Sequence, residues 1–85
     1  IANPEEIIKF SNVIEHYIQM LEEETNHMNS AFQQLGDTWR DQKRVAFEET
    51  YRVLNDTITV FKNNAQEQIP YLRQMAADLE TYLSR

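Results

Sequence analysis

The sequence predicts an all-α protein, a single antiparallel helix-turn-helix hairpin over residues 1–85. Two observations predict this fold. Hydrophobic residues recur at steps of three and four along two long stretches, which is the spacing of one face of an α-helix. A short break separates the stretches and holds Gly36 and Trp39, the only Gly and the only Trp of the chain. A break this short makes the second helix run back along the first.

The first helix is predicted over residues 4–35. Asn3 can cap its N-terminus, and Pro4 suits the first position because its missing N–H has no intrahelical partner there. Two glutamates follow near the positive end of the helix dipole. Hydrophobic side chains then recur every seven residues and predict a bundle interface, formed on this helix by Ile7, Ile14, Leu21 and Met28.

Residues 36–38 are predicted to form the turn. Gly36 adopts a left-handed conformation without a steric penalty, so we expect it to terminate the first helix in that conformation. Asp37 or Thr38 can then cap the second helix, whose first turn would contain Trp39.

The second helix is predicted over residues 38–84. Its hydrophobic residues alternate at steps of four and three over more than five heptads, the pattern of a coiled-coil seam. Pro70 lacks an N–H and crowds the preceding turn, so we expect a kink or break near it. The bundle interface on this helix comprises Phe47, Tyr51, Leu54, Ile58 and Phe61.

The lengths of the two helices predict an unmatched end. At 1.5 Å per residue the first helix spans about 48 Å and the second about 70 Å. In the predicted register Ile7 faces Glu67 and Arg52 approaches Glu22, so residues from Pro70 onward extend beyond the first helix. This end either folds back as a third helix or projects and is covered by another chain, and the second alternative fits better because two helices leave one side of each seam exposed. Its apolar stripe comprises Leu72, Met75, Leu79 and Tyr82.

Composition excludes several classes of partner. The chain has 14 acidic and 8 basic residues, a net charge of −6, which argues against nucleic acid and anionic membrane surfaces as ligands. No apolar run approaches the roughly 18 residues of a membrane span, so no membrane insertion is expected. No basic region followed by an apolar stretch marks a signal peptide. A chain of 85 residues buries a smaller share of its surface than a large protein does, so a protein partner is expected.

The sequence predicts no catalytic residues, no cofactor and no metal site. There is no cysteine, no Gly-bounded serine and no glycine-rich phosphate loop. Glu24 and His27 match the Glu-x-x-His element of di-iron helical bundles, but the companion helix lacks an inward-facing glutamate: Glu48 and Glu49 flank its hydrophobic seam. An enzyme is therefore not expected.

The residues around the turn resemble the WXG family, small ESAT-like proteins exported by type VII secretion systems. The turn carries a Trp at its far end, an aromatic residue follows eight positions later, and heptads flank both sides; the matching positions are Leu35, Trp39, Phe47 and Tyr51. The family has Trp, any residue and Gly. Here the third position is Asp41, so the motif would be a variant.

The resemblance implies a four-helix bundle of two hairpins, as a homodimer or as a heterodimer with a related hairpin, and no catalysis. It also implies that Trp39 joins a composite surface with a neighbouring C-terminal segment. A secretion ATPase or a larger effector is a further candidate partner. The recognition residues would be Trp39, Arg40, Asp41, Leu72, Met75, Leu79 and Tyr82.

Many members of the family carry a C-terminal Tyr followed four residues later by Asp or Glu. Tyr71 has Met75 at that offset, and Tyr82 would need a residue 86. The export signal is thus truncated away, divergent or carried by a partner. The resemblance implies a protein that is cytoplasmic before export and then secreted without a cleaved signal peptide. The alternative function is an intracellular helical adaptor or oligomerisation module whose exposed seam docks a larger protein.

Overall fold

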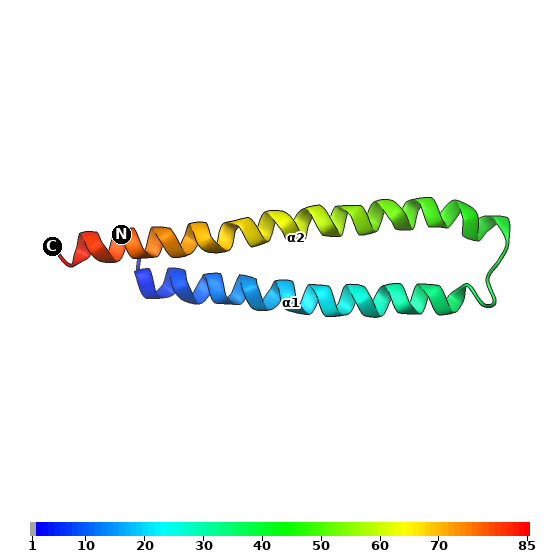
Figure 1. The fold of residues 1–85 in the computed structure, drawn as a ribbon, viewed down its shortest axis with the longest axis horizontal. Helices are drawn as coiled ribbons and strands as arrows, with labels where there is room; N and C mark the ends of the chain where they lie inside the picture. Colours follow the sequence, from blue (N-terminus) through cyan, green and yellow to red (C-terminus); the bar gives the residue numbers. More distant parts are fainter. Residues whose placement is uncertain (1) are drawn as a thin grey trace.

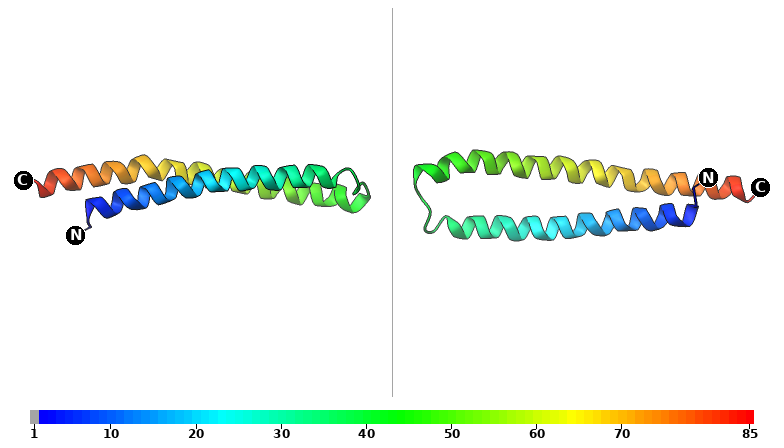
Figure 2. Two further views of the ribbon diagram at one scale, coloured as in Figure 1. Left: turned by 90° about the horizontal axis from the view of Figure 1, so that it is seen from below. Right: turned by 180° about the vertical axis from the view of Figure 1, so that it is seen from behind.

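The computed structural model describes residues 2–85 as a rod of two antiparallel helices (Figure 1). Helix α1 spans Pro4–Leu35 and helix α2 spans Gln42–Leu83. The rod measures 67 × 17 × 15 Å, and the two helices cross as they run past each other (Figure 2). The prediction of an all-α hairpin is therefore confirmed. Within residues 2–85, neither helix has a stretch that is long and apolar enough to cross a membrane.

Helix α1 begins as its sequence predicts. Asn3 is extended, and its side-chain oxygen accepts a hydrogen bond from the backbone N–H of Glu5 at 2.8 Å. Pro4 occupies the first turn, and Glu5 and Glu6 lie at the positive end of the helix dipole. This cap and charge pattern fixes the start of the helix locally, before any tertiary contact is made.

The prediction that Gly36 is left-handed is wrong. Gly36 has φ −62° and ψ −19°, a right-handed conformation, and its N–H donates to the carbonyl of Gln33 at 3.0 Å. The next residues close the helix end in the same way, and the N–H of Trp39 returns to the carbonyl of Leu35 at 2.8 Å. These bonds satisfy the last carbonyls of α1, so no left-handed residue is needed. Glycine suits this position because it has no Cβ, and a Cβ at position 36 would lie only 3.0 Å from Nη2 of Arg44.

The prediction that the second helix begins at residue 38 is also wrong. Asp41 caps α2, accepting from the backbone N–H groups of Lys43 and Arg44, so neither Asp37 nor Thr38 is the cap. The connection therefore runs over residues 36–41, and Trp39 lies in it rather than in the helix.

The longer connection shifts the register between the helices. Each residue of α1 faces a residue of α2 with a higher number than predicted, and Lys62 rather than Arg52 approaches Glu22, at 3.6 Å. Arg52 instead pairs within its own helix, with Glu49 at 2.6 Å and Asp56 at 2.8 Å.

The same shift corrects the prediction for the C-terminal segment. Helix α2 is unbroken at Pro70, which is exposed, and the flanking Ile69 is only 8% exposed. Ala76 is 1% exposed, and Arg73 bonds across to Asn12 and Glu15, both at 3.1 Å. Packing on both sides of the proline thus outweighs the hydrogen bond that it removes. The segment neither folds back nor projects as a whole, and only the end of α2 passes the start of α1 (Figure 1).

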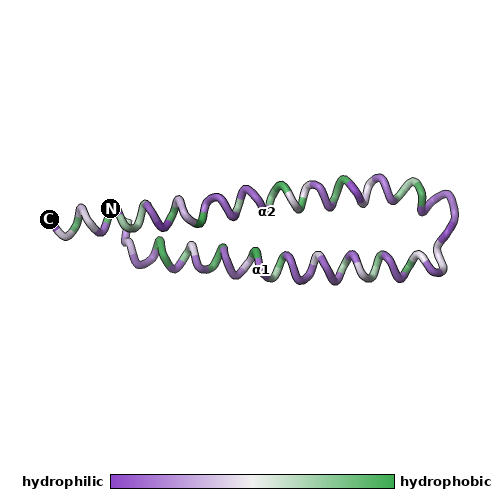
Figure 3. The backbone as a smooth tube through the Cα atoms, in the orientation of Figure 1, coloured by the Kyte–Doolittle hydropathy of each residue, from purple (hydrophilic) through white to green (hydrophobic). Residues whose placement is uncertain are grey.

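The seam between the two helices is small and partly polar. Its buried residues are Ile18, Ile69, Ala76 and Ser11, and the Ser11 hydroxyl donates to the carbonyl of Ile8 at 2.7 Å. Hydrophobic and hydrophilic residues alternate along both helices, and the stretch that leads from the turn into α2 is strongly hydrophilic (Figure 3). Several polar side chains occupy half-buried positions along the seam: Thr25, Asn29, Asn55, Lys62 and Arg73. The hairpin thus buries few large apolar side chains within itself.

Candidate partner-recognition site

Both helices expose large apolar side chains on one common side, which we call the apolar face. The rings of Tyr17 on α1 and Phe61 on α2 meet edge to face with centroids 6.2 Å apart, so the two exposed stripes are continuous. Around this contact lies a groove lined by Phe10, Val13, Ile14, Tyr17, Phe61, Ala65 and Gln68. The apolar face comprises Phe10, Tyr17, Phe47, Leu54, Phe61, Met75 and Tyr82, each at least 40% exposed.

The opposite side of the hairpin is polar. Two ion pairs cross between the helices there, Lys62 with Glu22 at 3.6 Å and Arg73 with Glu15 at 3.1 Å. The paired side chains remain partly open to water, so each pair contributes only about 0–1 kcal/mol. They nevertheless join residues far apart in the sequence, so they favour one register of the helices over its neighbours.

The predicted interface residues fall into two groups. Those of α1 (Ile7, Ile14, Leu21 and Met28) are half-buried, as are Tyr51 and Ile58 on α2. Ile14 lines the groove of the apolar face, whereas Leu21 and Ile58 line a hollow beside Glu22 and Lys62 on the polar side. Phe47, Leu54 and Phe61 are exposed on the apolar face itself. Of the predicted recognition residues on α2, Leu72 and Leu79 are half-buried, whereas Met75 is 40% exposed and Tyr82 is 65% exposed.

An aromatic cluster closes the hairpin at the turn. Phe32 of α1 stacks on Tyr51 of α2 with ring centroids 4.1 Å apart and contacts Phe47 at 5.9 Å. Trp39 packs on the other side of Phe47 at 5.8 Å, and the Tyr51 hydroxyl is hydrogen-bonded to the side chain of Asn29. Each aromatic pair contributes about 0.5–1.5 kcal/mol beyond its buried area, so the cluster fixes this end of the rod.

Arg44 also belongs to this end of the hairpin, although the sequence did not single it out. Its side chain is 15% exposed, with Cζ 4.5 Å from the ring centroid of Phe32. Its Nε donates to Glu48 at 3.0 Å, and its Nη1 donates to the carbonyl of Trp39 at 3.4 Å. Arg44 thus links α1, the turn and α2. The available signal in the sequence was its place four residues before Glu48, the spacing of an ion pair on one face of a helix.

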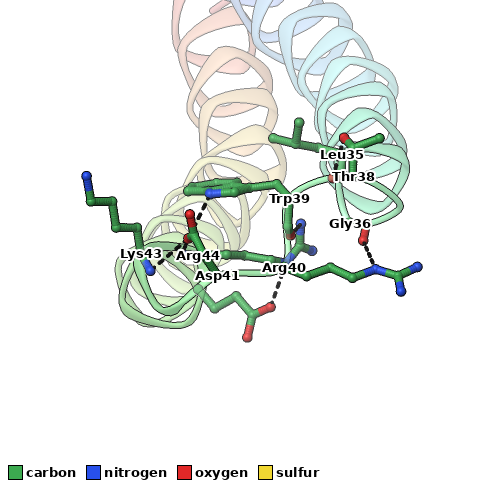
Figure 4. Close-up of polar contacts among 9 residues, drawn as sticks. Leu35, Gly36, Thr38, Trp39, Arg40, Asp41, Lys43 and Arg44 are labelled. Carbon is green, nitrogen blue, oxygen red and sulfur yellow. Dashed lines mark hydrogen bonds and ion pairs between the residues drawn. The ribbon is translucent and has the colours of Figure 1, made fainter.

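The predicted recognition residues of the turn lie together at the tip of the rod (Figure 4). Trp39 is half-buried, and its indole Nε1 donates to Oδ1 of Asp41 at 3.0 Å. Arg40 is exposed and donates to the carbonyl of Gly36 at 3.2 Å. The tip therefore presents a half-buried indole ring beside the exposed side chains of Arg40 and Asp41.

Neither of the other polar groupings forms a site. Glu24 and His27 approach to 3.8 Å on the surface of α1, and within residues 2–85 no three His, Asp or Glu side chains gather closely enough to hold a metal ion. The hydrogen bond from Arg52 lowers the pKa of the Glu49 carboxyl, and the positive charge of Arg52 adds to that effect. Both residues are exposed on α2.

Comparison with known families gives one match. Residues 1–82 match the family described as proteins of 100 residues with WXG. No curated protein and no solved structure matches the chain. The family match covers both helices and the turn, which is the region that carries Trp39 and the aromatic cluster. The chain therefore belongs to the WXG100 family of small helical proteins associated with type VII secretion.

Proposed function

We propose that this protein is a secretion substrate, or the partner of a substrate, of a type VII-like export system, and that it acts through helix-helix association without catalysis. The observation that carries the proposal is the apolar face. Phe10 is 57% exposed, Phe61 50% and Tyr82 65%. Monomeric soluble proteins rarely expose apolar stripes of this extent, so a stripe that follows most of α2 and the first half of α1 suits a binding surface.

The shape of the apolar face favours a second helical hairpin as the partner. On α2 it runs from Phe47 near the turn to Tyr82 near the C-terminus, almost the whole length of that helix, so another rod of two helices suits it. The product is a four-helix bundle, either a homodimer or a heterodimer with a related hairpin. The small, partly polar seam supports this reading, because an isolated hairpin gains little from its own hydrophobic burial.

The tip of the rod supplies the recognition element in this proposal. Trp39 is not one of the residues of the apolar face, and its half-buried ring packs on Phe47, the member of that face nearest to the turn. Trp is among the residues most enriched at interaction hot spots, and a half-buried indole beside Arg40 and Asp41 suits a peptide or a secretion ATPase. The protein would form its bundle in the cytoplasm and leave the cell without a cleaved signal peptide.

Export of the Trp39→Ala variant tests this role. In cells with a type VII system we expect a smaller exported fraction, while the purified variant stays folded. Removing a fully buried Trp costs about 3–5 kcal/mol, and a half-buried Trp39 should cost about half of that. The matched control is Val45→Ala, which truncates a side chain that is 66% exposed and outside the apolar face.

Normal export of Trp39→Ala would remove Trp39 from the recognition site. Retention of the wild-type protein in the cell, bound to a larger protein through the apolar face, would favour an intracellular adaptor instead.

A further inference from the structure

The carboxylate of Asp41 performs two tasks with one oxygen. Its Oδ1 accepts from the backbone N–H of Lys43 at 2.9 Å and of Arg44 at 3.1 Å, which caps α2. The same Oδ1 accepts from the indole Nε1 of Trp39 at 3.0 Å (Figure 4). We propose that Asp41 is a positioning residue that orients the Trp39 indole for partner recognition, in place of the Gly that the family has at this position. The proposal rests on the recognition role of Trp39.

The position of Trp39 explains why its ring needs an anchor. Trp39 lies in the connection and not in either helix, so no helical backbone restricts its side chain. One side of the ring contacts Phe47, with centroids 5.8 Å apart. This contact alone allows the ring to slide and tilt, because apolar contacts are not directional. The hydrogen bond from Nε1 to Asp41 adds the direction that the contact lacks.

The backbone that carries the indole is itself fixed. The N–H of Trp39 donates to the carbonyl of Leu35 at 2.8 Å, and Nη1 of Arg44 donates to the carbonyl of Trp39 at 3.4 Å. Asp41 is tied to the first turn of α2 through its cap bonds. The indole is therefore connected to both helices, to α1 through its own backbone and to α2 through the carboxylate.

A fixed ring binds a partner more tightly than a free one, because its side chain is already ordered in the folded protein and loses less conformational entropy on binding. Gly at position 41 would offer no acceptor to the indole and would leave α2 without its side-chain cap. Substitution of Asp41 by Gly therefore makes the sequence more like the family motif but should make the ring of this chain less ordered.

The experiment follows the single indole N–H of the chain in the full-length protein. Trp39 gives the only indole N–H resonance, and its solvent exchange and the tryptophan fluorescence anisotropy report on one side chain. Asp41→Ser keeps a good cap residue but shortens the side chain by one bond, so it separates the two tasks. Asp41→Asn is the matched control, because its amide oxygen has the same reach.

We expect wild type and Asp41→Asn to show a protected indole N–H and high anisotropy. In Asp41→Ser and Asp41→Gly the exchange should be faster by about tenfold, the change that corresponds to the loss of one net hydrogen bond. Helical content, measured by circular dichroism, should be the same in wild type, Asp41→Asn and Asp41→Ser.

Two results would overturn the proposal. One is unchanged exchange and anisotropy in Asp41→Ser. The other is a loss of protection that only follows a loss of helical content, because Asp41 would then act as a cap alone. Neither readout uses export, so a failure of Trp39→Ala to alter export would remove the recognition role and leave the positioning of the ring intact.

Discussion

Truncation of Leu54 isolates the contribution of the apolar face to association. Complete burial of a Leu side chain contributes about 1.5–3 kcal/mol relative to its exposure to water. Leu54 is 45% exposed in the hairpin, so about 1 kcal/mol per chain remains to be gained from a partner. A symmetric dimer contains the side chain twice. Leu54→Ala should therefore weaken the dimer by about 2 kcal/mol, or about 30-fold in Kd.

Sedimentation equilibrium over a range of concentrations measures this effect directly. Val45→Ala is the control, since Val45 is 66% exposed and lies outside the apolar face; its Kd should equal that of wild type. Leu54→Asp should abolish the dimer at micromolar concentration, because association would bury an unpaired carboxylate. A monomeric wild type, or a Leu54→Ala variant that dimerises as tightly as wild type, would refute the assignment of this face.

Three further predictions concern the hairpin itself. Ile18→Ala should lower the free energy of unfolding by about 2–5 kcal/mol, because Ile18 is only 3% exposed in the seam; a thermal melt as high as that of wild type would contradict the packing. Pro70→Ala should raise the free energy of unfolding, by up to about 3 kcal/mol, because it restores a helical hydrogen bond at an exposed site, and denaturant titration measures the difference. Arg52 lowers the pKa of Glu49, so their interaction is present above the pKa of an unfolded glutamate, about 4.3, and is lost as the pH falls through the lowered value. Glu49→Gln should accordingly show a smaller loss of stability on acidification below pH 5 than wild type does, and an unchanged acid transition would mean that the pair adds nothing.

Local signals in the sequence determined the helices and the family. The cap at Asn3, the proline at the first position and the heptad spacing place α1 where it lies, because these effects act within a few residues. The aromatic residues at positions 39 and 47, placed on either side of the second helix start, indicated the family correctly, although Asp41 stands where the motif has Gly.

Local signals in the sequence do not determine the residue at which α2 begins. Asp37, Thr38 and Asp41 are all good caps, and the differences among such residues are small compared with the roughly 1 kcal/mol that a cap contributes. Arg44 and the aromatic cluster favour the connection that ends at Asp41, through contacts that join α1 to α2. The choice among caps was therefore made by the packing of the hairpin end.

Only the tertiary structure decided the register of the two helices and which hydrophobic side chains lie in the seam between them. On each helix more than one row of hydrophobic residues repeats every seven positions. The heptads alone therefore do not say which row packs against the other helix. The inner seam contains Ser11 and other polar residues, while larger apolar side chains such as Phe61 stay outside. Arg73 pairs with Glu15 across 58 positions of sequence, and Ala76 is buried in the seam, so the segment after Pro70 lies against α1. The sequence by itself determined that two amphipathic helices form, because periodicity is local; which faces meet, and in what register, depends on contacts between residues that only folding brings together.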